Sequence, residues 1–159
     1  RDDEAGLDTL DHQPLYRERM VLAFATDHNF ATRQSLQISD LNSTSYIYRS
    51  HCPQARGMAK LVAAQGVRPH VACRTSQDER ALALVASGLG VSMVPDTFVC
   101  PGVALAPLAD LTVQSDVALV WPKDKSNDIV HRFKSFAASH DWKSRPPDNI
   151  GDGRLKWAR

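Results

Sequence analysis

The stretch of residues 76–95 constrains the fold of this chain more than any other part of the sequence. Its apolar residues first recur at helical spacing through Val85, and Gly88 then stands where a helix commonly ends. The short run Val91–Val94 follows and predicts a strand that stops at Pro95. A helix that leads through a glycine turn into a short strand is typical of folds built from alternating strands and helices.

The same alternation extends along most of the chain. Apolar or alternating runs predict strands at Met20–Ala25, Ser45–Arg49, Pro69–Arg74, Val91–Val94, Val103–Leu105 and Asp116–Trp121. Helical spacing predicts helices from Pro53 to Gly66, from the capping-box sequence Ser76–Glu79 to Gly88, and after a cap at Ser126 or Asn127. We therefore expect an α/β protein with mainly parallel sheets that helices cover on both sides.

Composition excludes several classes of protein. The chain has 159 residues, of which 43% are hydrophobic and 23% charged, as in a soluble globular protein. Nineteen Lys and Arg against eighteen Asp and Glu leave no cationic excess for binding the nucleic-acid backbone. No apolar run approaches the roughly 20 residues that span a bilayer, so we expect no membrane partner. The three cysteines cannot all pair, which favours a reducing, cytoplasmic setting.

Ligands of open α/β sheets bind beyond the carboxyl ends of the strands, which here means the loops after Arg49, Arg74 and Val94. The first two loops lead into helices, whose N-termini favour an anion. The predicted ligand-binding residues of the three loops are Ser50, His51, Cys52, Thr75, Ser76 and Pro95. A purely structural role stays open for each turn, with Ser50 or Ser76 acting only as a helix cap.

Other site chemistries have less support in the sequence. His51, Cys52, His70 and Cys73 are residue types that bind zinc, but His70 and Cys73 would point to opposite faces of one strand. Cys52 beside His51 suggests a thiolate nucleophile, yet no orienting carboxylate is evident. Gly88–Gly90 follows a helix and precedes a strand, the reverse of a phosphate-binding glycine loop. We expect no metal, no cofactor and no enzyme active site.

Five stretches carry a pattern that goes beyond these local signals. They are Pro14–Leu22, Asp27–His28, Ser39–Leu41, Tyr46–Cys52 and, most specifically, Ala81–Pro95. Together they resemble the effector-binding domain of LysR-type transcriptional regulators, over about Leu15–Trp142. The resemblance implies a type II periplasmic-binding-protein-like fold, in which two α/β lobes joined by two crossing strands hold a small inducer in their cleft.

The resemblance also implies a domain organisation. Residues 1–26 and 96–142 would form the first effector lobe, incomplete in this chain, residues 27–95 the crossover and second lobe, and residues 143–159 a polar C-terminal tail. The family's helix-turn-helix and linker helix would lie in a longer parent protein, which alone would meet promoter DNA and RNA polymerase. An incomplete lobe would expose apolar surface, so we expect a homo-oligomer or association with the missing N-terminal segment.

The function that this resemblance implies is that of an inducer-sensing, non-enzymatic domain of a bacterial transcription regulator. Ser50 and His51 match one loop that the family uses against inducers, and Thr75 and Ser76 match its neighbour. We expect the inducer to be a small anion. Cys52 stands where peroxide-sensing members keep a reactive cysteine, but Leu61 occupies about the place of the resolving partner. The alternative is a solute-binding receptor of the same fold that serves a transporter.

Overall fold

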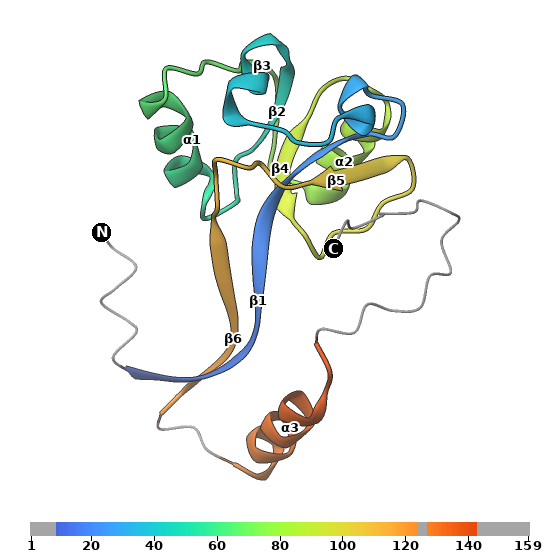
Figure 1. Cartoon of the computed structure of the whole chain (residues 1–159). Coiled ribbons are helices and arrows are strands. Elements are labelled where there is room, and N and C mark those ends of the chain that lie inside the picture. The colour runs from blue at the N-terminus through green and yellow to red at the C-terminus, as the bar shows by residue number, and fades with distance from the viewer. Residues whose placement is uncertain (1–8, 124–126, 143–159) are drawn as a thin grey trace. The chain divides into compact units, whose positions relative to one another are not determined.

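The computed structural model describes residues 9–123 and 127–142. Its strands are β1 (Leu10–Ala25), β2 (Ser45–Arg49), β3 (His70–Thr75), β4 (Ser92–Pro95), β5 (Val103–Ala106) and β6 (Gln114–Pro122) (Figure 1). Its α-helices are α1 (Ala55–Ala64), α2 (Asp78–Ala86) and α3 (Asp128–Ser139), and η2 (Asn29–Thr32) and η3 (Ile38–Ser43) are short 3-10 helices. The chain divides into two compact units, one of residues 19–113 and one that contains residues 9–18, 114–123 and 127–142. The assignment of the chain to two effector lobes stays a prediction.

The predicted strand Met20–Ala25 is the buried C-terminal part of β1, here called its second half, and β1 begins ten residues before the predicted start. All six residues are 3% exposed or less. Alternate side chains of this stretch enter two different cores. Met20 and Leu22 pack on one side of the strand, and Val21 and Ala23 pack on the other. β1 lies between β4 and β5, with Leu22 opposite both Met93 and Ala106. Burial on both faces explains why this stretch is continuously apolar.

The α/β class is confirmed, but the strand directions are mixed. β2 and β3 are parallel, as expected, and α1 forms the crossover between them. β4 and β5 run antiparallel to β1, so the expectation of mainly parallel sheets is wrong for this sheet. β1 is followed by the 3-10 helices η2 and η3 and then by β2 in a separate sheet, so no α-helical crossover leads from β1 to a parallel neighbour in its own sheet.

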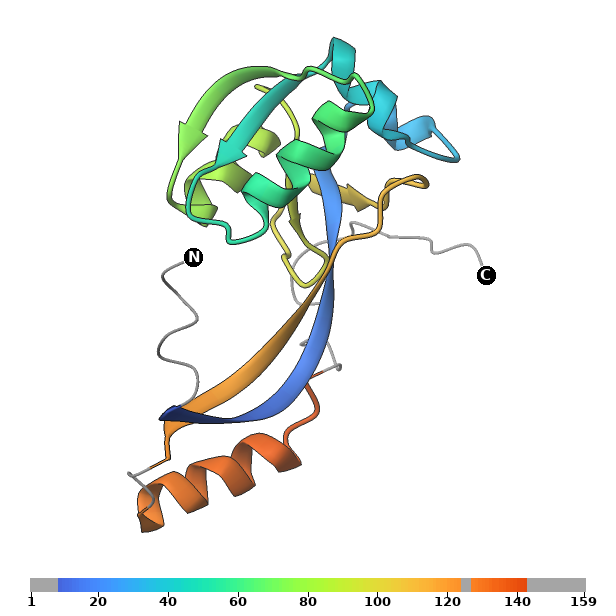
Figure 2. The ribbon, with the colours of Figure 1, turned by 90° about the vertical axis from the view of Figure 1, so that its left-hand side faces the viewer.

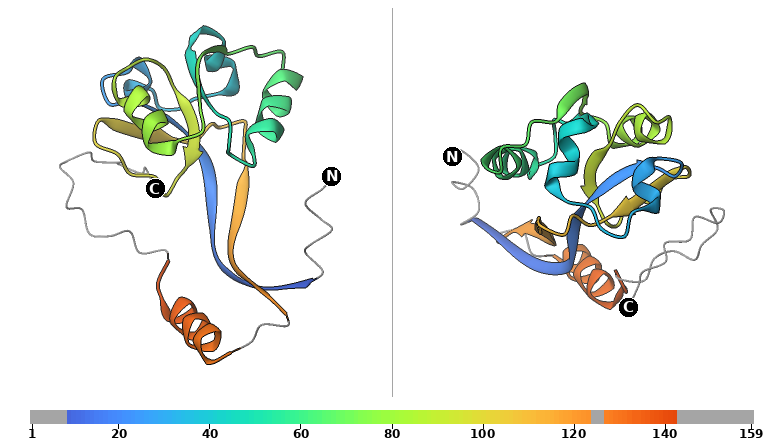
Figure 3. Two further views of the ribbon diagram at one scale, coloured as in Figure 1. Left: turned by 180° about the vertical axis from the view of Figure 1, so that it is seen from behind. Right: turned by 45° about the horizontal axis from the view of Figure 1, so that its top comes forward.

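Helices cover the two sides of the larger unit (Figure 3). Met58 and Val62 of α1 pack into the core that contains Leu22, and Ala81 and Val85 of α2 pack into the core that contains Val21. β2 is tied to the segment before β4 by two hydrogen bonds of 2.8 Å, from the Ile47 amide to Val91 and from the Val91 amide to Ser45.

The glycine turn after α2 forms as predicted. Gly88 has a φ of 76°, and its amide donates to the Val85 carbonyl at 2.9 Å. Gly90 passes so close to Ser45 that an added Cβ would overlap the Ser45 carbonyl. The position therefore requires glycine.

Two predicted helix starts are wrong by one or two residues. Ser76 does not cap α2, because Gln77 is the N-cap and the Thr75 hydroxyl accepts the Gln77 amide at 3.1 Å. The Thr75 hydroxyl, at the end of β3, therefore accepts a backbone amide at the start of α2, the role that the sequence predicted for the Ser76 hydroxyl. Pro53 lies in the turn before α1, which begins at Ala55.

The smaller unit contains the first half of β1, its partner β6, and α3 (Figure 2). Asn127 caps α3 as predicted, accepting the Val130 amide at 2.9 Å. The alternative cap Ser126 and the predicted tail 143–159 lie outside the described residues. The predicted apolar stripe of α3 is mostly exposed, since Ala137 alone of its residues is buried.

Candidate ligand-binding site

The loops that were predicted from separate parts of the sequence meet at one edge of the larger unit. Because β2 and β3 are parallel and Arg49 pairs with Thr75, both strands end together. Ser50 donates its amide (2.9 Å) and its hydroxyl (3.2 Å) to the Thr75 carbonyl. Arg49 also donates to the Met93 carbonyl of β4 at 3.1 Å, which places the end of β4 beside them. The structure therefore brings the carboxyl ends of three strands together.

An ion-pair network joins the first two loops. The Arg49 guanidinium is buried, and its Nε donates to Asp78 Oδ1 at 2.6 Å. His51 Nε2 lies 3.2 Å from the other carboxylate oxygen, Asp78 Oδ2. The Arg49 guanidinium also lies over the Phe98 ring, with 5.1 Å between its central carbon and the ring centroid. Asp78, in the first turn of α2, thus links the end of β2 to the start of that helix.

The charge state of this network follows from its geometry. Partial burial raises the pKa of Asp78, but the hydrogen bonds and charges of Arg49 and His51 prevail and hold that pKa below its usual value. Asp78 therefore stays ionised at neutral pH and compensates the Arg49 cation. Neither Arg49 nor Asp78 is among the site residues predicted from the sequence. The available signal was an arginine at the last position of one strand and an aspartate three residues after the next parallel strand.

The six predicted ligand-binding residues separate into two groups by exposure. Cys52, Thr75 and Pro95 are buried. Ser50, His51 and Ser76 are exposed. Within the described ranges, the Ser76 side chain makes no hydrogen bond.

The hydroxyl and thiol of the buried group already have partners. The Thr75 hydroxyl exchanges hydrogen bonds with the Gln77 backbone, and the Cys52 thiol donates to Gln54 Oε1 at 3.4 Å. Cys52, Cys73 and Cys100 are all free thiols. The accessible polar groups of the site are therefore those of Ser50, His51 and Ser76.

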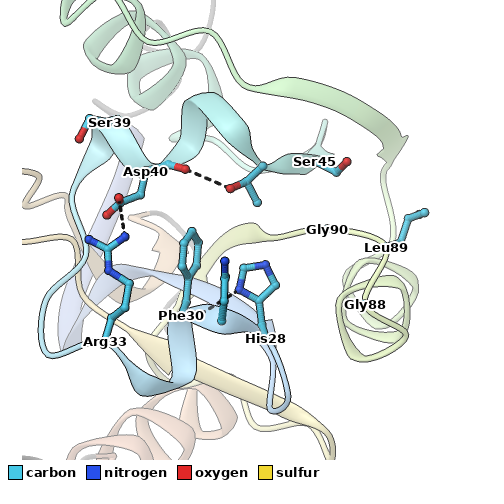
Figure 4. Close-up of a pocket in the computed structure, with 11 residues that line it drawn as sticks. His28, Phe30, Arg33, Ser39, Asp40, Ser45, Gly88, Leu89 and Gly90 are labelled. Atoms are coloured by element: carbon cyan, nitrogen blue, oxygen red, sulfur yellow. Dashed lines mark hydrogen bonds and ion pairs between the residues drawn. The ribbon is translucent and has the colours of Figure 1, made fainter.

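A concave region, the polar hollow, lies at the opposite end of β2, beside Ser45 (Figure 4). Its volume is about 470 Å³, and η2, η3 and the turn at Gly88–Gly90 line it. His28 Nδ1 accepts the Phe30 amide at 3.2 Å, and burial lowers the pKa of His28. None of the six predicted residues lines the hollow.

Two further classes of feature are not found in the part of the chain that the structure describes. No three His, Cys, Asp or Glu side chains are grouped so that they could hold a metal ion. No helix there is long and apolar enough to cross a membrane.

The model of the LysR substrate binding domain family matches residues 2–142. The chain belongs to this family. It is 28% identical over 131 residues to YwbI, an HTH-type transcriptional regulator of Bacillus subtilis (strain 168). The matched region covers 78% of this chain and 40% of YwbI. It is 26% identical over 124 residues to the HTH-type regulator BudR of Raoultella terrigena, covering 73% of this chain and 42% of BudR. The chain thus spans about two fifths of the length of these relatives.

Solved structures of LysR-family domains have the same fold. The effector binding domain of QuiR superposes with a TM-score of 0.68 at 22% identity, covering 87% of this chain and 66% of that one. The C-terminal domain of a probable LysR family regulator from Rhodococcus sp. RHA1 gives 0.71 at 19% identity, with coverages of 82% and 68%. The predicted periplasmic-binding-protein-like fold is confirmed.

Proposed function

We propose that this chain is the inducer-sensing domain of a transcription regulator, and that the inducer binds where β2, β3 and β4 end. The observation that carries the proposal is the pair of hydrogen bonds from Ser50 to the Thr75 carbonyl, which holds two strand-to-helix loops side by side. Ser50, His51 and Ser76 would contact the inducer, and the buried Cys52, Thr75 and Pro95 would support those contacts from beneath.

The inducer proposed for this site is a small anion. Two helices start here, and each start offers backbone amides and a positive dipole end. Because Asp78 already compensates Arg49, the amides and hydroxyls, rather than a free cation, would supply most of the binding energy. Two family domains were solved with ligands, QuiR with shikimate and Synechocystis PCC6803 CcmR with 2-PG. The CcmR domain superposes with a TM-score of 0.70 at 17% identity.

The role in the whole protein follows from the relatives. YwbI and BudR are HTH-type transcriptional regulators, so we propose that promoter DNA and RNA polymerase are bound through other parts of a longer protein, in the cytoplasm. We propose no catalytic step for this domain, because the matched family is one of regulators. The solute-receptor alternative finds no support among these relatives.

We also propose that the smaller unit binds another protein surface, either in a second copy or in the rest of a longer protein. Ile129, Phe133 and Phe136 of α3 are each more than half exposed. Light scattering on the purified chain would test self-association, and a concentration-independent mass of 17.6 kDa would contradict it.

Calorimetry with shikimate and a panel of small carboxylates, each paired with its neutral amide, would test the inducer site. We expect a carboxylate to bind at least about tenfold more tightly than its amide, because hydrogen bonds to charged groups are the stronger ones. Ser76→Ala should weaken carboxylate binding about tenfold, since its exposed hydroxyl has no partner within the described residues.

Ser39→Ala is the matched control, because Ser39 is also exposed but lines the polar hollow. It should leave the affinity unchanged. Loss of binding in Ser39→Ala with normal binding in Ser76→Ala would place the ligand in the polar hollow and contradict the proposal.

A further inference from the structure

An apolar pocket of about 220 Å³ that is partly open to solvent, here called the apolar cavity, lies in the larger unit, apart from both the proposed inducer site and the polar hollow. Side chains of α1, β2, β3 and β4 line it, together with side chains of η3, of the connection between α1 and β3 and of the connection between β5 and β6. The residues that the argument uses are Tyr46, Tyr48, Met58, Ala63, Arg68 and Met93. Figure 2 shows α1 lying alongside β2 in this unit. None of the six predicted ligand-binding residues lines the cavity.

The size and lining of this cavity suit a small apolar molecule. Most folded cores contain few voids larger than one water molecule. An apolar cavity of about 150 Å³ stays free of water and holds benzene. The present cavity has a larger volume and is partly open to solvent, and its walls include the buried side chains Met58 and Met93.

One polar group in the wall, the Tyr46 hydroxyl, has an acceptor role in a hydrogen bond but no donor role among the described residues. The Tyr46 hydroxyl accepts the Met93 amide at 3.3 Å. Within the described residues it donates to no acceptor. Burial raises the pKa of Tyr46 to about 12, so the hydroxyl keeps its proton at neutral pH. The hydroxyl of a buried tyrosine usually finds a hydrogen-bond partner, and here an acceptor atom of a bound ligand could fill that role.

We propose that this cavity is a second ligand site, which takes a small uncharged molecule with an apolar ring and one hydrogen-bond acceptor. The ring fills the space between α1 and β2, and the Tyr46 hydroxyl donates to the acceptor. A carboxylate does not suit the cavity, because its charge would lose hydration against a mainly apolar lining. Arg68 is the cation in that lining, and because it is exposed to water its charge would compensate little of this cost.

Acetophenone and cumene are suitable probes, because they have similar shapes and only acetophenone carries an acceptor. The chain has three methionines, and Met58 and Met93 line the cavity whereas Met20 does not. In protein labelled with ¹³C at the methionine methyl groups, acetophenone should shift the Met58 and Met93 signals and leave Met20 in place. Absence of these shifts at millimolar probe, or equal shifts at all three methionines, would overturn the proposal.

Two variants separate the roles of space and hydrogen bonding. Tyr46→Phe should weaken acetophenone about fivefold and leave cumene unchanged, because one neutral hydrogen bond is lost. Tyr48→Phe is the control for loss of a phenol group beside the same cavity, and it should leave the preference for acetophenone over cumene intact. Ala63→Leu should fill the cavity and abolish binding of both probes.

Two results would contradict the proposal. Tighter binding of benzoate than of acetophenone would contradict an uncharged ligand, and equal losses of both probes in Tyr46→Phe would contradict the role of the hydroxyl. If Ala63→Leu does not fold, the methionine shifts and Tyr46→Phe still decide the question. Because no inducer-site residue lines the cavity, Ser76→Ala should leave both probes unaffected.

Discussion

β1 belongs to both compact units, and its two halves have opposite surroundings. Every residue from Met20 to Ala25 is buried, whereas none from Leu10 to Arg19 is. The second half lies between β4 and β5 with a core on each side. A strand can thus change from solvent-exposed to fully enclosed within one continuous element, according to the neighbours that each half meets.

The helices of the two units differ in the same way. α2 and α3 both carry apolar residues at helical spacing. In α2, Ala81 and Val85 are fully buried against β1, β2 and β4, whereas Phe133 and Phe136 of α3 are 55% and 65% exposed. Helical periodicity shows which side chains can be buried together, and the neighbouring elements decide whether they are.

The largest expected difference between the units concerns these apolar side chains. Leu22→Ala should lower the free energy of unfolding by about 4 kcal/mol, because it leaves a cavity beside a fully buried strand. Phe136→Ala should cost less than about 1 kcal/mol, because its ring is already mostly in water. Urea unfolding followed by circular dichroism would measure both, and equal losses would show that α3 is covered in solution.

The Arg49–Asp78 pair of the larger unit and the Arg17–Asp116 pair of the smaller unit should differ in the same direction, but by less. Asp78→Asn should cost about 3 kcal/mol, because it leaves the buried Arg49 guanidinium without its counter-charge. Asp116→Asn should leave the urea midpoint unchanged within error, because the Arg17–Asp116 pair is exposed, with 62% and 61% of the side chains accessible.

The pH dependence of stability provides an independent check on Asp78. Its folded pKa is lowered, so its contribution is fully present above the unfolded value of about 3.9 and is lost as the pH falls through the folded pKa. The wild type should therefore lose stability below about pH 4, and Asp78→Asn should lose less over the same range. Identical acid profiles for the two proteins would contradict the network.

The smallest expected effect is local to the smaller unit. Asn127→Ala should destabilise α3 by about 1 kcal/mol, because the Val130 amide loses its cap. Hydrogen exchange should speed up in α3 and stay unchanged in the buried half of β1. Ser135→Ala, at an exposed position of the same helix, is the control and should change neither. Faster exchange at Met20–Ala25 in Asn127→Ala would show that the two units are coupled.

Much of the secondary structure could be predicted because its signals are local. β2 has the predicted bounds, α3 begins after the predicted Asn127 cap, and Gly88 has the positive φ that its place after a helix predicts. The capping of α2 was predicted wrongly because two hydroxyls, those of Thr75 and Ser76, compete for one turn. That competition depends on the path on which the preceding strand arrives.

The proximity of the Ser50 and Thr75 loops was predictable from the sequence, but the ion pairs between them were not. The rule that ligands bind beyond the carboxyl ends of strands selected the Ser50 and Thr75 loops, which the structure places in hydrogen-bond contact. The ion pair between Arg49 and Asp78 joins residues 29 positions apart. No local pattern shows that the carboxylate of one loop will compensate the guanidinium of the other.

The sequence by itself determined the three α-helices, the apolar parts of the strands and the glycine turn at Gly88, and it indicated the family to which the chain belongs. The tertiary structure alone decided the antiparallel pairing of β1 with β4 and β5, the Arg49–Asp78–His51 network, the apolar cavity with the Tyr46 hydroxyl in its wall, and the exposure of α3. The physical reason is range. Helix and turn preferences act over a few residues, whereas strand pairing, charge compensation and burial depend on groups that only the folded chain brings together.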